Sequence, residues 1–337
     1  MKPLSIKDIA KKANVSITTV SFILNGKAEK MRISQEMIAK VEKIIKELGF
    51  RPNQVARSLR TGNTKTIGLI VEDISNPFFA SIARLIEDKA YKHGYKIIYS
   101  STENNLDKAK GLIKMFKSRQ VDGYIIAPMR GMEDDIRGLL TERTPVVVFD
   151  RHLPGLDVST VLVNNVEGTF IATNTLIGNG KKNIAFVTVD VDAEEIKDRF
   201  KGYEAALSAH KIKIDKKLCK LIPFANSAEE TTAELVSFFT KNPKIDAVLF
   251  ATNYLAVRGL FCFKQMDKQI NDDFKVIAYD DHDIFKLHSP TISAVSQPVD
   301  AIADTVITLI LKGLSAVDTL EEHEAEHVVL SSTLVEN

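Results

Sequence analysis

The hydrophobic residues of this chain follow two different spacings, and the change between them divides the sequence into a head and a body. Over the first 50 residues they recur at helical intervals in three short segments, 6–13, 17–24 and 35–48. From Thr66 onward they gather into short apolar runs, and amphipathic stretches of helical length lie between these runs. The pattern predicts an all-α head followed by an α/β body.

The ends of the predicted head helices carry capping residues. Ser5 precedes the first helix and Asp8 follows three residues later, which is typical of a capping box. Asn14 comes after this helix, and asparagine tolerates the left-handed conformation of a tight turn. Ser16 is placed to cap the second helix, and Gly49 to end the third. Two short helices joined by a tight turn and supported by a third predict a helix-turn-helix unit.

The second predicted helix has an apolar side and a side rich in short polar residues. Val20, Ile23 and Leu24 lie on the apolar side. The opposite side carries Ile17, Thr18, Ser21, Phe22 and Asn25. Serine and threonine are short enough to bring a helix backbone close to DNA, and their hydroxyls can bond to phosphates. A small three-helix bundle that binds no ligand is the alternative interpretation.

Charge is distributed unevenly along the chain. The formal net charge is +1, yet residues 1–62 contain 13 Lys or Arg and 5 Asp or Glu, a net of +8. The rest of the chain has 32 basic and 39 acidic residues, a net of −7. A basic head on an acidic body indicates that the head meets a polyanion. A merely solvated, lysine-rich surface would give the same count.

Residues 51–62 join the predicted head, residues 1–50, to the predicted body, residues 63–337. Pro52 blocks continuation of the third helix, and Asn53 is placed to cap a further helix of about two turns. Helices that short are only marginally stable in water. A basic linker is the alternative to a hinge helix.

The apolar runs of the body form two series. They are TIGLIV, KIIYS, DGYIIAP and PVVVFD, followed by KNIAFVT, KLCKLI, DAVLFAT and KVIAYDD. Apolar strands separated by helices predict parallel sheets that are covered on both faces. Two such series indicate two α/β lobes.

Polar residues follow directly after several of these runs. In open parallel sheets, ligands bind beyond the carboxyl ends of the strands. The residues at such positions include Asp73, Asn76, Phe78, Phe79, Asp150, Arg151, Asn253, Asp280 and Asp281. Buried carboxylates need partners, so we expect these polar groups to line a site, although ordinary turn and cap chemistry explains some of them.

Composition limits the class of protein. The chain has 337 residues, of which 45% are hydrophobic and 26% charged, the balance of a soluble globular protein with two or three domains. No apolar run approaches the roughly 18 residues of a membrane span, and the charged start MKPLSIKDIA lacks the core of a signal peptide. The two cysteines, Cys219 and Cys262, are predicted to be buried free thiols. We expect a cytoplasmic protein.

Two segments have the appearance of enzyme motifs. HEAEH, residues 323–327, matches a zinc-protease pattern, but it is polar all round and no further histidine follows it. GNGKKN, residues 178–183, follows a helix and lacks the Ser or Thr of a phosphate loop. We interpret the first as a solvated loop and the second as a helix-to-strand turn. We predict no enzyme activity, no metal and no cofactor.

The segment 6–26, IKDIAKKANVSITTVSFILNG, resembles the start of the lactose-repressor (LacI/GalR) family of regulators, whose usual form is DVAxxAGVSxxTVSRVLN. The similarity continues along nearly the whole chain. The resemblance implies that Ile17, Thr18 and Phe22 point into the major groove of DNA. It implies in addition that the DNA backbone is contacted or approached by Ser16, Thr19, Ser21 and Asn25.

This chain departs from the family pattern in two places within the head. The family's common arginine, which often reads guanine, is Phe22 here. We therefore predict base reading by apolar contact with thymine methyls and one hydroxyl contact; the alternative is that Phe22 folds back over the adjacent turn. The connection GKAEKMRIS, residues 26–34, is a few residues longer than usual, and its cations can add phosphate contacts. These cations are Lys27, Lys30 and Arg32.

The resemblance also assigns a role to the linker. It implies a hinge that becomes helical when two copies meet on DNA. Leu59 would wedge into the minor groove at the operator centre, which bends the duplex and enlarges the contact. Asn53, Arg57 and Arg60 complete the predicted DNA contacts of this segment.

The body resembles the family's periplasmic-binding-protein-like effector domain. The resemblance implies a first lobe of about 63–165 and 296–325, and a second lobe of about 166–295 and 326–337. It carries the effector site onto Asp150, Arg199, Asn253, Asp280 and Gln297. These groups suit a polyhydroxylated ligand, a sugar or a sugar acid. Phe78, Phe79 and Phe224 could form an apolar wall, although core packing is the commoner fate of such rings; Tyr254 stands where the family often has Asp.

We therefore predict a sequence-specific DNA-binding transcriptional regulator that acts as a homodimer on double-stranded operator DNA. We expect a repressor controlled by a sugar or sugar-derived effector. The alternatives are an activator of the same family, a sugar-binding transport protein, and an α/β enzyme with a DNA-binding head.

Overall fold

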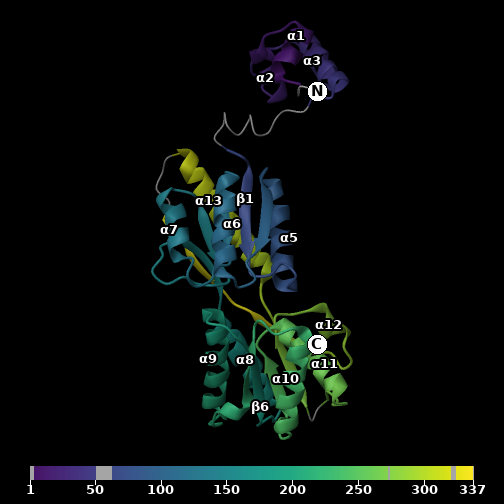
Figure 1. The fold of residues 1–337 in the computed structure, drawn as a ribbon, viewed down its shortest axis with the longest axis vertical. Coiled ribbons are helices and arrows are strands. Elements are labelled where there is room, and N and C mark those ends of the chain that lie inside the picture. Colours follow the sequence, from purple (N-terminus) through teal and green to yellow (C-terminus); the bar gives the residue numbers. More distant parts are fainter. Residues whose placement is uncertain (1–3, 51–62, 272–273, 320–323, 337) are drawn as a thin grey trace. The chain divides into compact units, whose positions relative to one another are not determined.

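The computed structural model describes residues 4–50, 63–271, 274–319 and 324–336. The chain divides into two compact units, the head up to Thr64 and the body from Lys65 (Figure 1). No helix within these described ranges is long and apolar enough to cross a membrane.

The head contains the three predicted helices, α1 (Ile6–Ala13), α2 (Ile17–Leu24) and α3 (Gln35–Leu48). The backbone N–H of Ser5 donates to Asp8 Oδ2 over 2.9 Å, so the predicted capping-box contact is present at the start of α1. Asn14 and Gly49 both adopt the left-handed conformation, with φ of 55° and 61°. The predicted helix-turn-helix unit is therefore confirmed.

The core of the head is formed by small and branched side chains from all three helices. Ile9, Ala13, Val20 and Val41 are completely buried there. Alanine at position 13 lets α1 and α2 approach closely, because it has no atoms beyond Cβ. The core thus fixes which face of α2 remains outside.

The body contains two six-stranded sheets. The first has the order β11-β5-β4-β3-β1-β2 and is parallel throughout. Its strands are β1 (Thr66–Val71), β2 (Lys96–Ser101), β3 (Gly123–Ile126), β4 (Val146–Phe149), β5 (Ser159–Val163) and β11 (His327–Leu330). Its helices are α5 (Pro77–Lys92), α6 (Leu106–Ser118), α7 (Glu133–Thr141) and α13 (Val299–Thr319). Side chains of α5 and α13 form one core layer with the sheet, and those of α6 and α7 form the other.

The second sheet repeats this order as β12-β10-β9-β8-β6-β7, except that β12 is antiparallel to β10. Its strands are β6 (Ile184–Asp190), β7 (Cys219–Pro223), β8 (Ala247–Phe250), β9 (Lys275–Tyr279), β10 (Ser293–Ser296) and β12 (Thr333–Val335). Its helices are α8 (Asn165–Gly178), α9 (Glu194–Ala209), α10 (Ala228–Lys241), α11 (Asn253–Gln265) and α12 (Asp283–Leu287). The predicted pair of parallel α/β lobes is confirmed.

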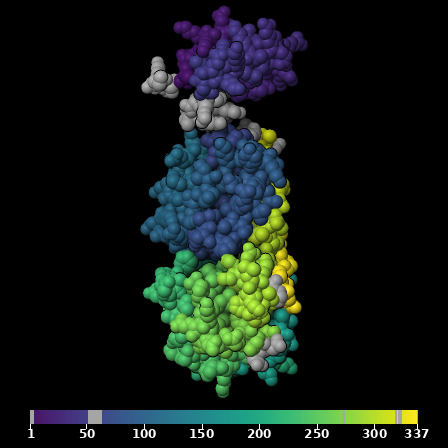
Figure 2. Space-filling model, turned by 90° about the vertical axis from the view of Figure 1, so that its right-hand side faces the viewer, coloured from purple at the N-terminus to yellow at the C-terminus, as the bar shows by residue number. Residues whose placement is uncertain are grey.

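The chain crosses between the two lobes after β5, after β10 and after β11. In the space-filling view, the yellow residues of α13 lie against the blue first lobe (Figure 2). The strand β11 pairs with β5, placing His327 beside Thr160 and Leu330 beside Val163. The predicted assignment of residues 326–337 to the second lobe is therefore wrong for β11, because this strand completes the first sheet before the chain crosses for the last time.

The enzyme-like segments have ordinary structural places. Residues 179–183 connect α8 to β6, as predicted for a helix-to-strand turn. Of HEAEH, residues 324–326 lack regular structure and His327 opens β11, so the predicted loop is wrong at its last residue; His323 lies outside the described residues. In the described part of the chain, no group of three or more His, Cys, Asp or Glu could hold a metal ion.

Both cysteines are free thiols. Cys262 is completely buried, and burial raises its pKa to about 12. Cys219 is only half-buried, so the prediction of two buried thiols is correct for Cys262 alone.

Glycine at position 202 allows α8 and α9 to pack in close contact. A Cβ atom added there would lie 2.3 Å from the carbonyl oxygen of Val166 and 2.9 Å from Cβ of Thr169. The backbone of α8 cannot yield without moving the helix itself. This contact matters for the cleft because α9 carries Arg199 and α8 begins at the crossover between the lobes.

We predict that Gly202→Ala destabilises the body by about 1–3 kcal/mol, the usual effect of overpacking. Urea denaturation monitored by circular dichroism would measure it. Gly178→Ala is the matched control, because no atom lies within 4 Å of its added Cβ; alanine there should be neutral or stabilising by up to about 1 kcal/mol. Equal stability of the two variants would contradict the packing argument.

Candidate functional site

The exposed face of α2 holds the residues predicted to meet DNA. Ile17 is 44% exposed, Ser16 and Thr18 are exposed, and the other four positions, Thr19, Ser21, Phe22 and Asn25, are half-buried. Neither Ile17 nor Phe22 belongs to the set of hydrophobic residues that form or pack against the described core of the head. This placement favours a surface role for Phe22 over core packing.

Hydrogen bonds hold the polar groups of this face in position. The backbone N–H of Thr19 donates to Ser16 Oγ over 3.0 Å, and the two hydroxyls lie 2.8 Å apart. Asn25 Nδ2 donates to the carbonyl oxygen of Ser21 over 2.6 Å. Ser16 therefore caps the start of α2, and Asn25 bonds to a carbonyl oxygen of its last turn.

Of the two other predicted parts of the DNA-binding region, the structure describes the connection between α2 and α3 but not the linker after α3. Asn53, Arg57, Leu59 and Arg60 lie outside the described residues. In the connection, residues 28–32 form turns that begin at the buried Ala28. Lys27, Lys30 and Arg32 are exposed in this connection.

The second candidate site is a cleft within the body, where the carboxyl ends of strands from both lobes meet. It consists of two adjoining spaces, which we call the inner and outer chambers. The inner chamber has an unfilled volume of about 40 Å³ and the outer chamber about 460 Å³. Glu72, Asn76, Val189, Phe224 and Tyr254 line both of them.

The structure brings most of the predicted effector residues to the inner chamber. They are Asn76, Phe78, Phe79, Asp150, Arg199, Phe224 and Asp280. Asp73 and Asn253 line the outer chamber instead. Gln297 lies behind Asp280, to which its Nε2 donates over 2.5 Å. Phe78 and Phe79 also belong to the core of the first lobe, so these two rings serve both roles.

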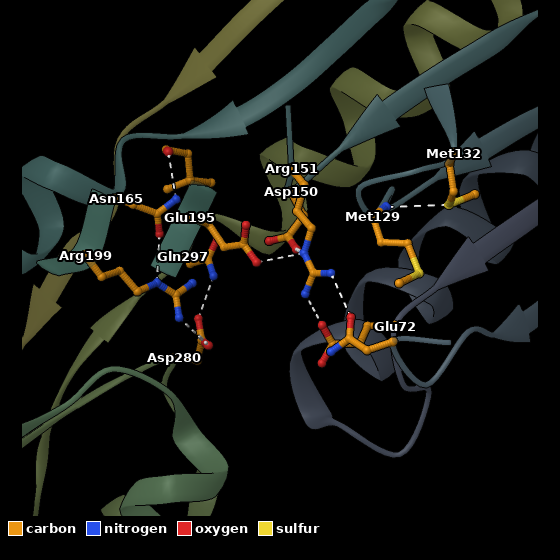
Figure 3. Close-up of polar contacts among 12 residues, drawn as sticks. Glu72, Met129, Met132, Asp150, Arg151, Asn165, Glu195, Arg199, Asp280 and Gln297 are labelled. Carbon is orange, nitrogen blue, oxygen red and sulfur yellow. Dashed lines mark hydrogen bonds and ion pairs between the residues drawn. The ribbon is translucent and has the colours of Figure 1, made fainter. Parts of the chain in front are cut away.

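Arg199 is buried in the wall of the inner chamber and is held by groups from three elements (Figure 3). Its Nε donates to Asn165 Oδ1 over 2.9 Å, and its Nη1 donates to the carbonyl oxygen of Ala251 over 2.6 Å. Its Nη1 lies 3.6 Å from Asp280 Oδ2, and the guanidinium stacks 3.8 Å from the centre of the Tyr279 ring. Burial lowers the pKa of Arg199, but the nearby carboxylates outweigh this effect and the pKa is raised.

A second guanidinium, Arg151, joins the two lobes (Figure 3). Its Nη2 donates to Glu72 Oε2 in the first lobe, and its Nε lies 2.7 Å from Glu195 Oε1 on α9 in the second lobe. Its Nη1 donates to Asn104 Oδ1 over 3.2 Å. Only 12% of the Arg151 side chain is exposed, so this interlobe ion pair is largely shielded from solvent.

Glu72 and Glu195 were not predicted as site residues, and Arg151 was placed beyond a strand end but not assigned to the effector site, although the sequence carries a signal for each of them. Glu72 is a charged residue directly after the buried run TIGLIV. Arg151 follows Asp150 at the end of a strand. Glu195 precedes Arg199 by four positions and so shares its helical face.

Asp150 and Asp280 occupy equivalent positions in the two lobes, one after β4 and the other after β9. Both have φ of 69°, in the left-handed region, which aspartate tolerates better than most residues. The N–H of Asp150 donates to Val161 over 3.0 Å, and that of Asp280 to Val295 over 2.9 Å. The shared turn directs both carboxylates into the cleft.

Negative charge exceeds positive charge in the inner chamber. Four carboxylates, Glu72, Asp150, Glu195 and Asp280, line it together with two guanidinium groups. Burial and the neighbouring carboxylate of Glu195 raise the pKa of Asp150 well above its ordinary value, while Arg199 lowers it and Asp280 raises it. The raised pKa reflects the unfavourable energy of an ionised, buried Asp150 beside these carboxylates.

Comparisons with known proteins agree for both units. Residues 64–328 match the family described as periplasmic binding proteins and sugar binding domain of LacI family, and residues 5–53 match bacterial regulatory proteins, lacI family. The chain is 32% identical over 335 residues to the HTH-type transcriptional regulator RegA of Clostridium saccharobutylicum, with 98% of each chain covered. It is 29% identical over 336 residues to the HTH-type transcriptional repressor PurR of Aliivibrio fischeri (strain MJ11), again with 98% of each covered.

Solved structures share the fold. The lac repressor dimer bound to operator and the anti-inducer ONPF matches with a TM-score of 0.84 at 20% identity, over 99% of this chain and 98% of that one. A periplasmic binding protein/LacI transcriptional regulator from Alkaliphilus metalliredigens QYMF, complexed with D-xylulofuranose, matches with a TM-score of 0.71 at 25% identity, over 81% of this chain and 97% of that one.

We predict that Asp150→Asn raises the melting temperature at pH 8 by about 2–4 °C, the shift that accompanies about 1 kcal/mol in a domain of this size. A carboxyl whose pKa is raised by folding stabilises the fold below its unfolded pKa, near 3.8, and this contribution is lost as pH rises through the folded value. The neutral amide avoids that loss, so the gap between variant and wild type should shrink as pH falls. Thermal denaturation between pH 5 and 8 would measure it.

The groups that face Asp150 decide the sign of this effect: Glu195 and Asp280 oppose its ionisation, whereas Arg199 and Arg151 favour it. Asp283→Asn is the control, because this side chain is 91% exposed and its removal should be neutral at every pH. A lower melting temperature of Asp150→Asn at pH 8 would show that the two guanidinium groups dominate.

Proposed function

This chain belongs to the LacI family of bacterial regulatory proteins, and from that premise we propose that it is a repressor. Its affinity for an operator is set by a hydroxylated small molecule, a sugar or sugar derivative, that binds in the cleft of its body. It is a DNA-binding transcriptional regulator with a helix-turn-helix head and a ligand-binding body. The observation that carries the proposal is the convergence of Asp150, Arg199 and Asp280 on one cleft behind such a head.

The face of α2 supports a role in reading DNA. Its hydroxyls suit phosphate contacts, and Ile17 and Phe22 offer apolar surface to thymine methyls. The head also has a net charge of +8 over residues 1–62, which attracts a polyanion regardless of sequence. The positive charge of the head thus contributes affinity for any DNA, and the face of α2 contributes selectivity for a particular DNA sequence.

The donors and acceptors of the cleft support a hydroxylated ligand. Carboxylates accept hydrogen bonds from hydroxyl pairs, and Phe224 adds an apolar edge. A sugar acid is disfavoured, because four carboxylates and only two guanidinium groups line the inner chamber. Among the relatives, PurR is named a repressor and the Alkaliphilus protein was solved with D-xylulofuranose.

Exposed apolar side chains on the body support a homodimer. Tyr99 on the edge strand β2 is 53% exposed, and Leu221 on the edge strand β7 is 51% exposed. Phe261 on α11 and Leu287 on α12 are 52% and 83% exposed. Unpaired strand edges with apolar side chains favour association, and the lac repressor structure that shares this fold is a dimer on its operator.

Dimerisation would give the protein two heads for two half-sites of a palindromic operator. Binding of the second head is then intramolecular, which raises affinity without new contacts. Ligand binding between the lobes would change the spacing of the heads, with a coupling of about 1–3 kcal/mol, typical of allosteric proteins. Because its target is the bacterial chromosome, the cytoplasm is its place of action.

Three alternatives are less well supported. An activator would use the same sites with the opposite transcriptional effect. A sugar-binding transport protein would have no use for α2 and its polar face. An α/β enzyme with an accessory head would need to transform its ligand, whereas the relatives named above are regulators.

We predict that the purified protein selects a palindromic duplex from random DNA and that at least one carbohydrate changes its affinity for that duplex by about 5–150-fold. Fluorescence anisotropy with a panel of sugars would measure the change. Asp280→Asn should keep DNA binding and lose the response, because it removes a carboxylate of the cleft but keeps an acceptor for Gln297. Asp283→Asn, exposed on α12, should respond normally. Conversion of a sugar to product, or no preference for any duplex, would overturn the proposal.

A second prediction concerns Phe22. Replacing it by Arg supplies a bidentate donor for guanine, worth about 1–3 kcal/mol of discrimination, so duplexes selected by the variant should gain a guanine at one position of each half-site. Met31→Arg adds the same charge in the connection, where the side chain at position 31 is 44% exposed, and should tighten binding without changing the selected sequence. Identical site preferences for wild type and Phe22→Arg would show that position 22 reads no base.

A further inference from the structure

The two chambers of the cleft differ in size in a way that constrains what can enter each of them. One water needs about 10–15 Å³ of such volume, so the 40 Å³ of the inner chamber accommodate about three waters or one small functional group. A pyranose ring does not fit there. The outer chamber, at about 460 Å³, is large enough for a ring and its hydroxyls.

The inner chamber has a buried acceptor without a partner. Glu195 is 6% exposed, and its Oε1 lies beside Arg151. Its other oxygen, Oε2, is buried with no hydrogen-bond partner in the part of the chain that the structure describes. A buried carboxylate oxygen in this condition is unfavourable unless a donor reaches it.

Both of the protein's own cations near the chamber already lie beside carboxylates. Arg199 is held by Asn165, the Ala251 carbonyl oxygen and Asp280. Arg151 is held by Glu72, Glu195 and Asn104. Two positive charges therefore face four carboxylates. A cationic ligand group would reduce this excess of negative charge, whereas an anionic ligand would add to the repulsion.

An ammonium group matches this environment better than any other biological cation. It is compact and has three N–H donors. Three acceptors line the chamber with unused capacity: Glu195 Oε2, the Asp150 carboxylate, whose nearest cation is 3.6 Å away, and Asp280 Oδ2. A guanidinium, with five donors in a fixed planar fork, matches three acceptors less well.

We propose that the effector of this protein carries a protonated primary amine that occupies the inner chamber, joined to a polyhydroxylated body that occupies the outer chamber. The chemical class is an amino sugar or a related amino-polyol. The inference rests on the proposed function, because it names the class of effector for that same cleft.

The test compares ligands that differ only at the amine. Glucosamine, galactosamine and mannosamine are measured against their parent hexoses, their N-acetyl derivatives and the corresponding hexuronates, by thermal shift and by isothermal titration calorimetry on the full chain. At least one aminohexose should bind about tenfold or more tightly than its parent hexose. N-acetylation should abolish that advantage, because it removes the charge and enlarges the group, and hexuronates should bind worst.

A pair of variants on α9 locates the amine. Glu195→Gln keeps the size and removes the charge; it should weaken the aminohexose by about tenfold or more beyond any change it causes in the parent hexose. Glu194→Gln, an exposed neighbour on the same helix, should alter neither. Asp150→Asn, which is expected to fold more stably than the wild type, should show the same selective loss as Glu195→Gln and covers the case in which the latter does not fold.

The results distinguish this inference from the proposed function. Equal or tighter binding of a neutral hexose or a hexuronate overturns the amine while leaving the sugar-responsive regulator intact. Equal weakening of both ligand types by Glu195→Gln also overturns it, because the residue would then be structural. If no carbohydrate of any type binds or alters DNA affinity, both fail.

Discussion

The buried guanidinium of Arg199 is the contact on which the geometry of the cleft depends. It joins the first turn of α8, the end of β8 and the end of β9, through Asn165, the Ala251 carbonyl oxygen and Asp280. Asn165 directly follows the first crossover between the lobes, and Gln297, which bonds to Asp280, lies in the second. The polar groups that face the cleft are therefore bonded to the same segments about which the lobes can rotate, so a ligand that repositions Asp280 acts on those segments directly.

The contacts that cross the cleft differ greatly in what they can contribute. Arg130 and Asp192 form an interlobe ion pair whose side chains are 66% and 53% exposed, and exposed pairs of this kind contribute about 0–1 kcal/mol. Arg151 and Glu195 are 12% and 5% exposed. Breaking a buried pair by removing one partner is much more costly, because it leaves an unpaired buried charge. The contact between the two lobes across the cleft therefore depends mainly on Arg151, with Asn253 Nδ2 donating to Asn76 Oδ1 over 3.0 Å beside it.

The sequence predicted those features that are determined locally. Helix ends followed from Ser5, Asn14, Ser16 and Gly49, because capping depends on neighbours within four residues. Asp150 and Asp280 were found by the rule that ligands bind beyond strand ends. Features that depend on residues far apart in the chain could not be predicted from the sequence. The strand β11 pairs with a strand more than 160 residues earlier, and the bond between Arg151 and Glu72 spans 79 positions. The division of the cleft into two chambers depends on side-chain packing from both lobes, which no local pattern encodes.

The excess of carboxylates gives the cleft a source of energy for switching. Two like charges 4 Å apart repel by about 4 kcal/mol at an effective dielectric constant of 20. Asp150 in the first lobe is repelled by Glu195 and Asp280 in the second lobe, so a neutralising group between these carboxylates would remove repulsion that opposes their approach. A ligand can shift a conformational equilibrium only by its difference in affinity for the two states. A group that relieves repulsion between carboxylates of opposite lobes favours the state in which those carboxylates are close, which is the difference in affinity that an allosteric coupling requires. The repulsion among the carboxylates of the inner chamber would thus make ligand binding and the approach of the two lobes depend on each other.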